Sequence, residues 1–139
     1  MAAKIYPYLT FENAKVAMDY YAQYFGAEII RRVPLTEEQA VSLGLPSENL
    51  AATTAQGEFL VAGQKLLCAD ATMMTPQASS LVSIFLTFAG DTAAARAFFE
   101  QITVAPDLRV TLPFGPHQFN GQLGQVVDRY GITWFVAAE

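Results

Sequence analysis

The sequence contains one strand-and-helix pattern twice. The run Tyr8–Phe11 (Tyr-Leu-Thr-Phe) returns 77 residues later as Phe85–Phe88 (Phe-Leu-Thr-Phe). Each copy is followed by an alanine-rich run that ends in two adjacent aromatic residues, Tyr20-Tyr21 and then Phe98-Phe99. A unit that repeats at about half the chain length is the pattern left by an internal duplication. We therefore expect two similar modules that share one sheet.

The size and charge of the chain limit its organisation and its partners. With 139 residues, of which 53% are hydrophobic, the chain can build the core of one domain. We expect a single domain over residues 1–139, with module one at about 1–70, a linker at about 71–80 and module two at about 81–139. The net charge is −5 without any block of like charges, so we expect no nucleic acid or membrane partner.

The cellular compartment follows from cysteine usage and from the first residues. Cys68 is the single cysteine, so an internal disulfide is excluded. The run Met1–Ile5 leads into strand-like sequence without the apolar region of a signal peptide. The sequence therefore predicts a cytoplasmic protein.

The first module is expected to follow the order strand, helix and three strands. β-Branched and aromatic residues predict a strand over Lys4 to Phe11, and Asn13 is suited to cap a helix that runs to about Phe25. The three-and-four spacing of Val16, Ala17, Tyr20, Tyr21 and Tyr24 predicts the buried face of that helix, and Gly26 ends it. Further strands are expected over residues 27–33, 50–61 and 65–69, with a hairpin turn at Gly63-Gln64.

An excursion and a second module complete the pattern. Thr36–Gln39 predicts a short capped helix, and Thr36–Asn49 is a candidate lid or fixed surface loop. In the second module we expect strands over residues 82–88, 107–113, 119–127 and 132–137, with a helix opened by Asp91 that reaches about Ile102. The turn at 128–131 ends in Gly131, which suits a positive φ. The fold class is α+β, with two βαβββ modules.

Three stretches carry a resemblance to a known superfamily. They are Pro7–Phe11, the run Tyr21-x-x-x-Phe25-Gly26-Ala27-Glu28, and Gly124-x-x-x-Asp128-x-x-Gly131-x-x-Trp134. In this order they resemble the PhnB-like branch of the vicinal oxygen chelate superfamily, which includes glyoxalase I, extradiol dioxygenases and bleomycin-resistance proteins. The resemblance implies a glyoxalase-like open, U-shaped mixed sheet with helices on the outside. It also implies a homodimer.

The same resemblance locates the positions at which metal-using relatives hold an ion. Aligned through the repeat, these positions are Tyr6, Leu67, Ser83 and Phe135. Divalent cations in this superfamily prefer imidazole nitrogens and carboxylate oxygens, which these four side chains do not supply. We therefore expect no metal at this site, and the sequence indicates no other cofactor.

A cleft could persist without a metal. Side chains alternate along a strand, so those facing the concave side of the sheet would form an aromatic cleft with a few hydroxyls. Such a cleft suits a small apolar or aromatic ligand. The alternative is that these aromatic rings fill the cleft themselves. The predicted ligand-binding residues are Tyr6, Tyr8, Leu67, Ser83, Phe85, Thr133 and Phe135.

Other side chains with possible chemistry favour structural interpretations. His117 is the single histidine and could act as an acid or base, but no partner is evident in the sequence. Cys68 is expected to be an inert buried thiol, and Trp134 a core residue. The carboxylates Glu58 and Asp70 could each act as a base if directed into the cleft, but solvated positions are expected for both. Adjacent Arg31 and Arg32 point to opposite faces, so at most one could reach the cleft.

Three functions stay open at this point, and no catalytic residue is assigned. The first is a module that sequesters or senses a small molecule in a metal-free cleft. The second is an enzyme of the vicinal oxygen chelate type, lyase-like or dioxygenase-like, acting on a small carbonyl or phenolic compound. The third is a scaffold with a closed cleft that works through its surface. The methyltransferase label common among PhnB-like sequences gains no support, because none of the nine glycines forms a nucleotide-binding loop.

Overall fold

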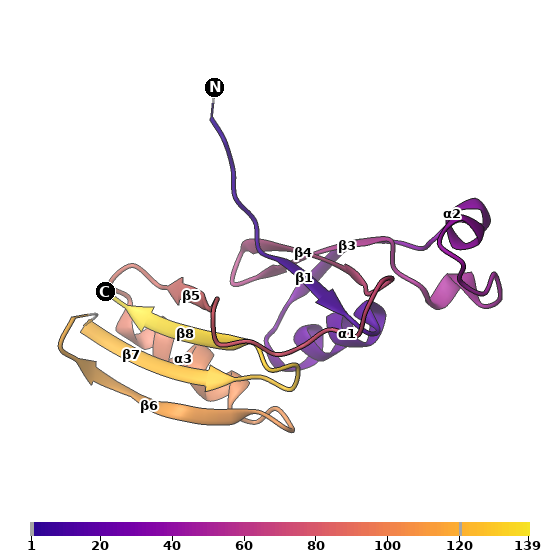
Figure 1. The fold of residues 1–139 in the computed structure, drawn as a ribbon. Helices are drawn as coiled ribbons and strands as arrows, with labels where there is room; N and C mark the ends of the chain where they lie inside the picture. Colours follow the sequence, from indigo (N-terminus) through magenta and orange to yellow (C-terminus); the bar gives the residue numbers. More distant parts are fainter. Residues whose placement is uncertain (1, 120) are drawn as a thin grey trace. The chain divides into compact units, whose positions relative to one another are not determined.

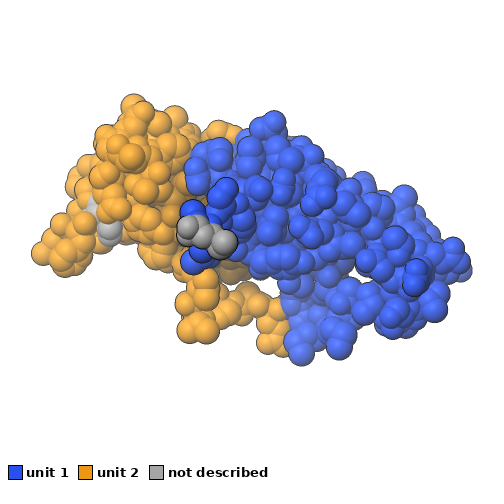
Figure 2. Space-filling model, turned by 90° about the horizontal axis from the view of Figure 1, so that it is seen from above, with its two compact units in different colours: residues 1–76 blue, residues 77–139 orange. Residues whose placement is uncertain are grey.

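The computed structural model describes residues 2–119 and 121–139, which form two compact units. Residues 1–76 make up the first unit and residues 77–139 the second (Figure 2). Each unit carries one βαβββ pattern and one four-stranded mixed sheet (Figure 1). The predicted α+β class with two βαβββ modules is therefore confirmed, whereas the described strands form two sheets of four where the repeat was expected to give one shared sheet. Residue 120, which lies inside the strand predicted over 119–127, and residue 1 fall outside the described residues.

In the first unit the sheet has the order β1-β4-β3-β2. Strands β1 and β4 run parallel, whereas β4, β3 and β2 are antiparallel neighbours. Helix α2 and the 3-10 helix lie in the connection between β2 and β3 (Figure 1). The elements are β1 (Tyr8–Phe11), α1 (Ala14–Tyr24), β2 (Glu28–Val33), α2 (Glu37–Ser42), a 3-10 helix (Leu50–Ala52), β3 (Gln56–Val61) and β4 (Gln64–Asp70).

The second unit repeats this topology in the order β5-β8-β7-β6. Strands β5 and β8 are parallel, and α3 lies across one face of the sheet (Figure 1). Tyr8 pairs with Leu67 in the first sheet, and Phe85 pairs with Phe135 in the second. The register therefore matches the sequence repeat residue by residue. The elements are β5 (Ile84–Thr87), α3 (Thr92–Ile102), β6 (Arg109–His117), β7 (Gly121–Val127) and β8 (Thr133–Ala138).

The long helices begin where capping residues predict. The Asn13 side chain accepts a hydrogen bond from Val16 N at 3.2 Å, and Asp91 accepts one from Ala94 N at 3.0 Å. On the buried face of α1, the Tyr21 ring stacks on Phe59 with centroids 5.5 Å apart. Val16 does not belong to this face, because it is 50% exposed. The helical face that contacts the sheet instead includes Met18, which is almost completely buried.

Three predicted boundaries were wrong for physical reasons. The stretch 50–61 is not one strand, since the Thr53 hydroxyl donates to Leu50 O and closes a 3-10 turn ahead of β3. The β3–β4 hairpin turn is Ala62-Gly63, where φ angles of 49° and 79° fit the left-handed conformations that a two-residue hairpin loop requires. Strand β6 continues past Pro113 to His117, because it is an edge strand with one side free of pairing.

The motif that ends the second module builds a turn and a core contact. The buried Asp128 carboxylate accepts hydrogen bonds from Tyr130 N at 2.8 Å, Ile132 N at 3.1 Å and Trp134 Nε1 at 2.9 Å. Gly131 has a φ of 82°, and a Cβ there would overlap with the side chain of Ala78. The spacing Asp-x-x-Gly-x-x-Trp therefore has a structural explanation in which one carboxylate holds three donors.

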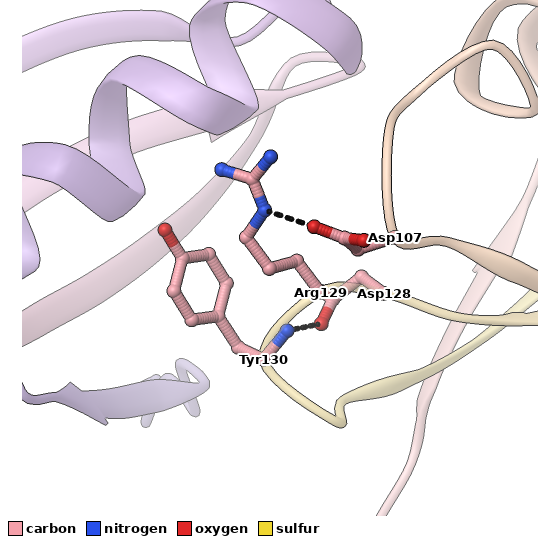
Figure 3. A network of polar contacts seen from close by, with 4 residues as sticks. All are labelled: Asp107, Asp128, Arg129 and Tyr130. Carbon is pink, nitrogen blue, oxygen red and sulfur yellow. Dashed lines mark hydrogen bonds and ion pairs between the residues drawn. The ribbon is translucent and has the colours of Figure 1, made fainter.

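The same turn is joined to the loop before β6. Figure 3 shows Arg129 Nε directed at the Asp107 carboxylate, with 3.4 Å between Nε and Oδ2. Tyr130 lies beside Arg129, and burial raises the pKa of its phenol.

Gly124, earlier in β7, leaves space for a side chain of α3. The ring of Phe99 occupies this space, and a Cβ at residue 124 would overlap with it. Gly124 therefore allows α3 to pack closely on β7.

Candidate ligand-binding cavity

The first unit contains a cavity of about 680 Å³. Cavities of roughly 300–1,000 Å³ are the size that proteins use for small molecules. Three parts of the first unit form its walls: the β1 and β4 ends of the sheet, the segment between β2 and β3, and the chain that follows β4. The lining residues are Tyr8, Thr10, Leu35, Glu38, Gln39, Ser42, Leu43, Thr54, Ala55, Ala69, Asp70, Ala71, Thr72, Met73 and Met74.

The sheet wall of the cavity follows from the alternation of side chains along β1. Phe11 is 2% exposed on the face that packs against α1, whereas Tyr8 on the other face is 55% exposed. Parallel pairing places Thr10 opposite Ala69 and Phe11 opposite Asp70. The cavity therefore begins at the face of β1 that the helix does not cover, as the alternation predicts for Tyr8 and Thr10.

Asp70 is the charged residue that the sheet wall contributes. Its Oδ1 accepts a hydrogen bond from Ala14 N and its Oδ2 accepts one from Thr54 N, both at 2.8 Å. Ala14 is the first residue of α1, where backbone N–H groups have no partner inside the helix. The expectation that Asp70 is solvated was wrong, because β4 ends beside these free donors. Each carboxylate oxygen still has capacity to accept a further bond.

The opposite wall is supplied by the connection between β2 and β3. The Arg32 guanidinium donates to the carbonyl oxygens of Thr53 at 2.5 Å and Ala51 at 2.9 Å. Leu35 N also donates to Thr53 Oγ1 at 3.0 Å, which ties the two ends of the connection together. The base of the segment predicted as a lid or fixed loop is thus firmly bonded. Above this base, α2 presents Glu38, Gln39 and Ser42 to the cavity.

Helix α2 is capped as the sequence predicts. Thr36 Oγ1 accepts from Gln39 N at 3.1 Å, and Gln39 Oε1 accepts from Thr36 N at 2.8 Å. This reciprocal pair satisfies two of the free donors at the start of a helix of only six residues. The cap therefore orients the cavity-lining face of α2.

Of the seven ligand-binding residues predicted from the sequence, Tyr8 alone lines this cavity. Leu67 is its partner in the register, and the Tyr6 ring lies under Lys65 Nζ at 5.0 Å. The other four belong to the second unit. There, Phe85 and Phe135 lie side by side with ring centroids 6.0 Å apart, Ser83 is exposed just before β5, and Thr133 is buried.

The remaining candidates occupy structural environments. Burial raises the pKa of the Cys68 thiol to about 11, and the nearby Asp70 carboxylate acts in the same direction. Glu58 pairs with Lys65 at 3.2 Å. His117 ends β6, where its Nδ1 accepts from Phe119 N at 3.4 Å. Trp134 is 1% exposed, which confirms its prediction as a core residue.

The residues present do not fit the metal that the superfamily suggests. Within residues 2–119 and 121–139, no group of three His, Cys, Asp or Glu side chains is placed to hold an ion. The four positions aligned with metal ligands carry a phenol, an alkyl chain, a hydroxyl and a phenyl ring: Tyr6, Leu67, Ser83 and Phe135. Such a set lacks the imidazole and carboxylate donors of divalent metal sites.

Sequence reasoning missed several apolar residues of the cavity. Leu35 and Leu43 flank α2, while Met73 and Met74 follow β4 in the stretch predicted as a linker. No periodic pattern marks these positions, because they lie in irregular segments that fold over the sheet. The one available signal was the excursion 36–49, which the sequence marks as a candidate lid.

The two modules give the chain a glyoxalase-like fold, which it shares with solved structures. The family model described as 3-demethylubiquinone-9 3-methyltransferase matches residues 3–137, and the chain belongs to this family. The predicted PhnB-like branch is therefore confirmed. A comparison with curated protein sequences finds no match.

Solved structures share this fold over almost the whole chain. A PhnB protein from Bacillus cereus is 23% identical, with a TM-score of 0.68 and coverage of 99% of this chain and 100% of that one. Protein PA1353 from Pseudomonas aeruginosa is 25% identical, with a TM-score of 0.70 and coverage of 99% and 98%. The fosfomycin resistance protein FosX from Listeria monocytogenes is 13% identical, with a TM-score of 0.64 and coverage of 100% and 94%.

None of the described helices has both the length and the apolar character needed to span a bilayer.

Proposed function

We propose that this protein binds a small, largely apolar or aromatic molecule in the cavity of residues 1–76 and does so without a metal. The observation that carries the proposal is the cavity itself, about 680 Å³ in volume, with Tyr8 on one wall and Leu35, Leu43 and two methionines on others. An exposed aromatic ring can stack on a flat ligand, and thioether side chains adapt to irregular apolar shapes. Burial of one ligand ring would contribute roughly 2 kcal/mol.

An enzyme of the vicinal oxygen chelate type is the second candidate. Its support is the shared fold of FosX, one structure of which is described as a complex with Mn(II) and 1S,2S-dihydroxypropylphosphonic acid. The Asp70 carboxylate in the cavity could act as a base toward a carbonyl or phenolic compound. Against this candidate stands the set of side chains at the four metal-ligand positions. We therefore place it behind the binding function.

Methyl transfer, which the family description names, is not part of our proposal. A methyl donor nucleotide is usually bound at a glycine-rich turn between a strand and a helix of a parallel sheet. Both sheets here are mixed and have four strands each. A scaffold with a closed cleft, the third candidate, is disfavoured by the volume of the cavity in the first unit.

The proposal is tested by filling the cavity. Thr10 is exposed on β1 and lines the cavity, so Thr10→Trp should place an indole in it. The matched control is Thr87→Trp at the equivalent, exposed position of β5 in the repeat. A ligand found by thermal-shift screening should raise the Tm of the wild type and of Thr87→Trp but not of Thr10→Trp.

Two results would contradict the proposal. If Thr87→Trp loses binding and Thr10→Trp keeps it, the ligand uses the second module instead. If elemental analysis of protein expressed with zinc, nickel and manganese finds a stoichiometric metal, the metal-free part is wrong. Such a result would favour the second candidate function, an enzyme of the vicinal oxygen chelate type.

A homodimer and a cytoplasmic location complete the proposal, together with one domain built from both modules. The dimer is supported by apolar side chains on the edge strand β2, where Ile29, Ile30 and Val33 are each about 40% exposed or more. A sedimentation experiment that finds only a 15.1 kDa species would contradict it. The location rests on the single cysteine.

A further inference from the structure

The charge of the cavity lining is uniform in sign. Glu38 reaches the cavity from α2, and Asp70 reaches it from the end of β4. Among the described residues that line the cavity, none is Lys, Arg or His. Both acidic residues therefore belong to the lining, Asp70 in the sheet wall and Glu38 on the short helix. The Asp70 carboxylate is held by Ala14 N and Thr54 N and adds its negative charge at the edge of the cavity, whereas Glu38 is exposed.

The cation Arg32 contacts the cavity wall through the lining residue Thr54. One guanidinium nitrogen lies 3.5 Å from Thr54 Oγ1, but its shorter bonds go to the carbonyl oxygens of Ala51 and Thr53. The guanidinium is thus directed to the loop before β3 and does not line the cavity. Its charge reduces the negative potential of the wall without offering an anion a direct contact.

The apolar part of the lining also suits a positive charge. The face of an aromatic ring attracts an organic cation, and Tyr8 is more than half exposed at the cavity. Met73 and Met74 add polarisable thioethers that carry no charge. A ligand with a flat apolar body and one amine would contact the ring and thioethers with its body and a carboxylate with its charge.

We infer that the preferred ligand of this cavity is an amphipathic organic cation, such as an aromatic or alkyl amine. This inference rests on the proposed binding function and specifies its ligand class. An anionic ligand, by contrast, would be repelled by Glu38 and Asp70. The net charge of −5 acts in the same direction at longer range.

The test compares three probes that share one naphthalene ring: 2-naphthylmethylammonium, 2-naphthylmethanol and 2-naphthoate. The ammonium should bind about fivefold to tenfold more tightly than the alcohol in low salt, and the carboxylate should bind most weakly. The preference for the ammonium should shrink toward unity at about 1 M salt, where screening acts within a few ångströms. Affinities are measured by calorimetric titration.

Variants of α2 locate the charge effect. Glu38→Gln should reduce the preference for the ammonium about twofold to threefold, with little effect on the alcohol. Glu37→Gln is the matched control, since Glu37 is the exposed neighbour on the same turn and does not line the cavity. Equal losses in the two variants would overturn the placement of the cation beside Glu38.

The outcomes separate this inference from the proposed function. If the three probes bind equally and Thr10→Trp abolishes all binding, the cavity is a binding site but the inference of a cationic ligand is wrong. If none of the probes binds up to millimolar concentration, both the cationic ligand and the proposed binding function are contradicted. If the ammonium is preferred and Thr10→Trp abolishes its binding, both stand.

Discussion

Replacing Asp128 by Asn should strongly destabilise the second module. The carboxylate is 3% exposed and accepts three hydrogen bonds, including one from the buried indole of Trp134. Asparagine is nearly the same size but replaces one acceptor oxygen with an NH₂ donor. If its remaining oxygen keeps the two backbone donors, the NH₂ group faces the indole N–H, and two buried donors oppose each other.

The magnitude follows from the bond that is lost. A hydrogen bond to a charged acceptor contributes about 1.5–3 kcal/mol, and a buried donor without a partner adds a penalty of similar size. Asp128→Asn should therefore lower the free energy of unfolding by about 2–4 kcal/mol. For a chain of this length, this corresponds to a decrease in Tm of roughly 5–15 °C.

A double-mutant cycle with Trp134→Phe isolates the contact. Since phenylalanine lacks the indole N–H, the two substitutions should be non-additive by about 1.5–2 kcal/mol in urea unfolding. The control is Asp107→Asn, which removes the exposed partner of Arg129 and should change stability by less than about 0.5 kcal/mol. An Asp128→Asn variant as stable as this control would refute the structural role of the carboxylate.

The other predictions concern packing, ionisation and the anchored connection. Gly124→Ala should lose about 1–3 kcal/mol in urea unfolding, because the new methyl group overlaps with the Phe99 ring. Between pH 9.0 and about 11, the unfolded chain releases the Cys68 proton that the folded chain keeps. The free energy of unfolding should therefore fall by up to about 1.4 kcal/mol per pH unit relative to Cys68→Ala. Removal of the guanidinium in Arg32→Met should increase amide hydrogen exchange in Glu37–Ser42.

Each of these predictions has a matched comparison. Gly115→Ala adds a methyl group with no atom within 4 Å and should be almost neutral, so an equal loss in both glycine variants would contradict the packing argument. Cys68→Ala that shows the same alkaline decrease as the wild type would exclude the thiol as its cause. Arg31→Met changes the exposed neighbour of Arg32, and faster exchange there too would point to a general loss of stability.

The repeated architecture could be predicted because local signals agree with it. Asn13 and Asp91 both cap helices, and the repeat aligns Tyr8 with Phe85 in equivalent register positions. These features depend on neighbours in sequence or on the alternation of side chains along a strand. Strand β6 was misjudged because Pro113 is a reliable end signal only where both sides of a strand are paired.

The cavity could be predicted only in part because its walls come from irregular segments. Tyr8 was placed by the alternation along β1, and Asp70 was expected to be solvated because its backbone partners, Ala14 and Thr54, are 56 and 16 residues away. Met73 and Met74 lie in a stretch whose polar composition favours a linker. A carboxylate that bonds distant backbone groups leaves no local trace in a sequence.

The insertion between β2 and β3 gives the two halves of this duplicated chain unequal freedom to change. In the first unit that connection holds α2 and the 3-10 helix, whereas β6 and β7 of the second unit are joined by only a few residues. The two ends of the insertion are joined by hydrogen bonds from Arg32 and Leu35 to Thr53. The residues between these ends can therefore be exchanged without altering any strand pair. After duplication, one module could thus keep the original architecture while the other gained an insertion whose sequence is free to change. Relatives could then differ in ligand preference through changes in this insertion alone.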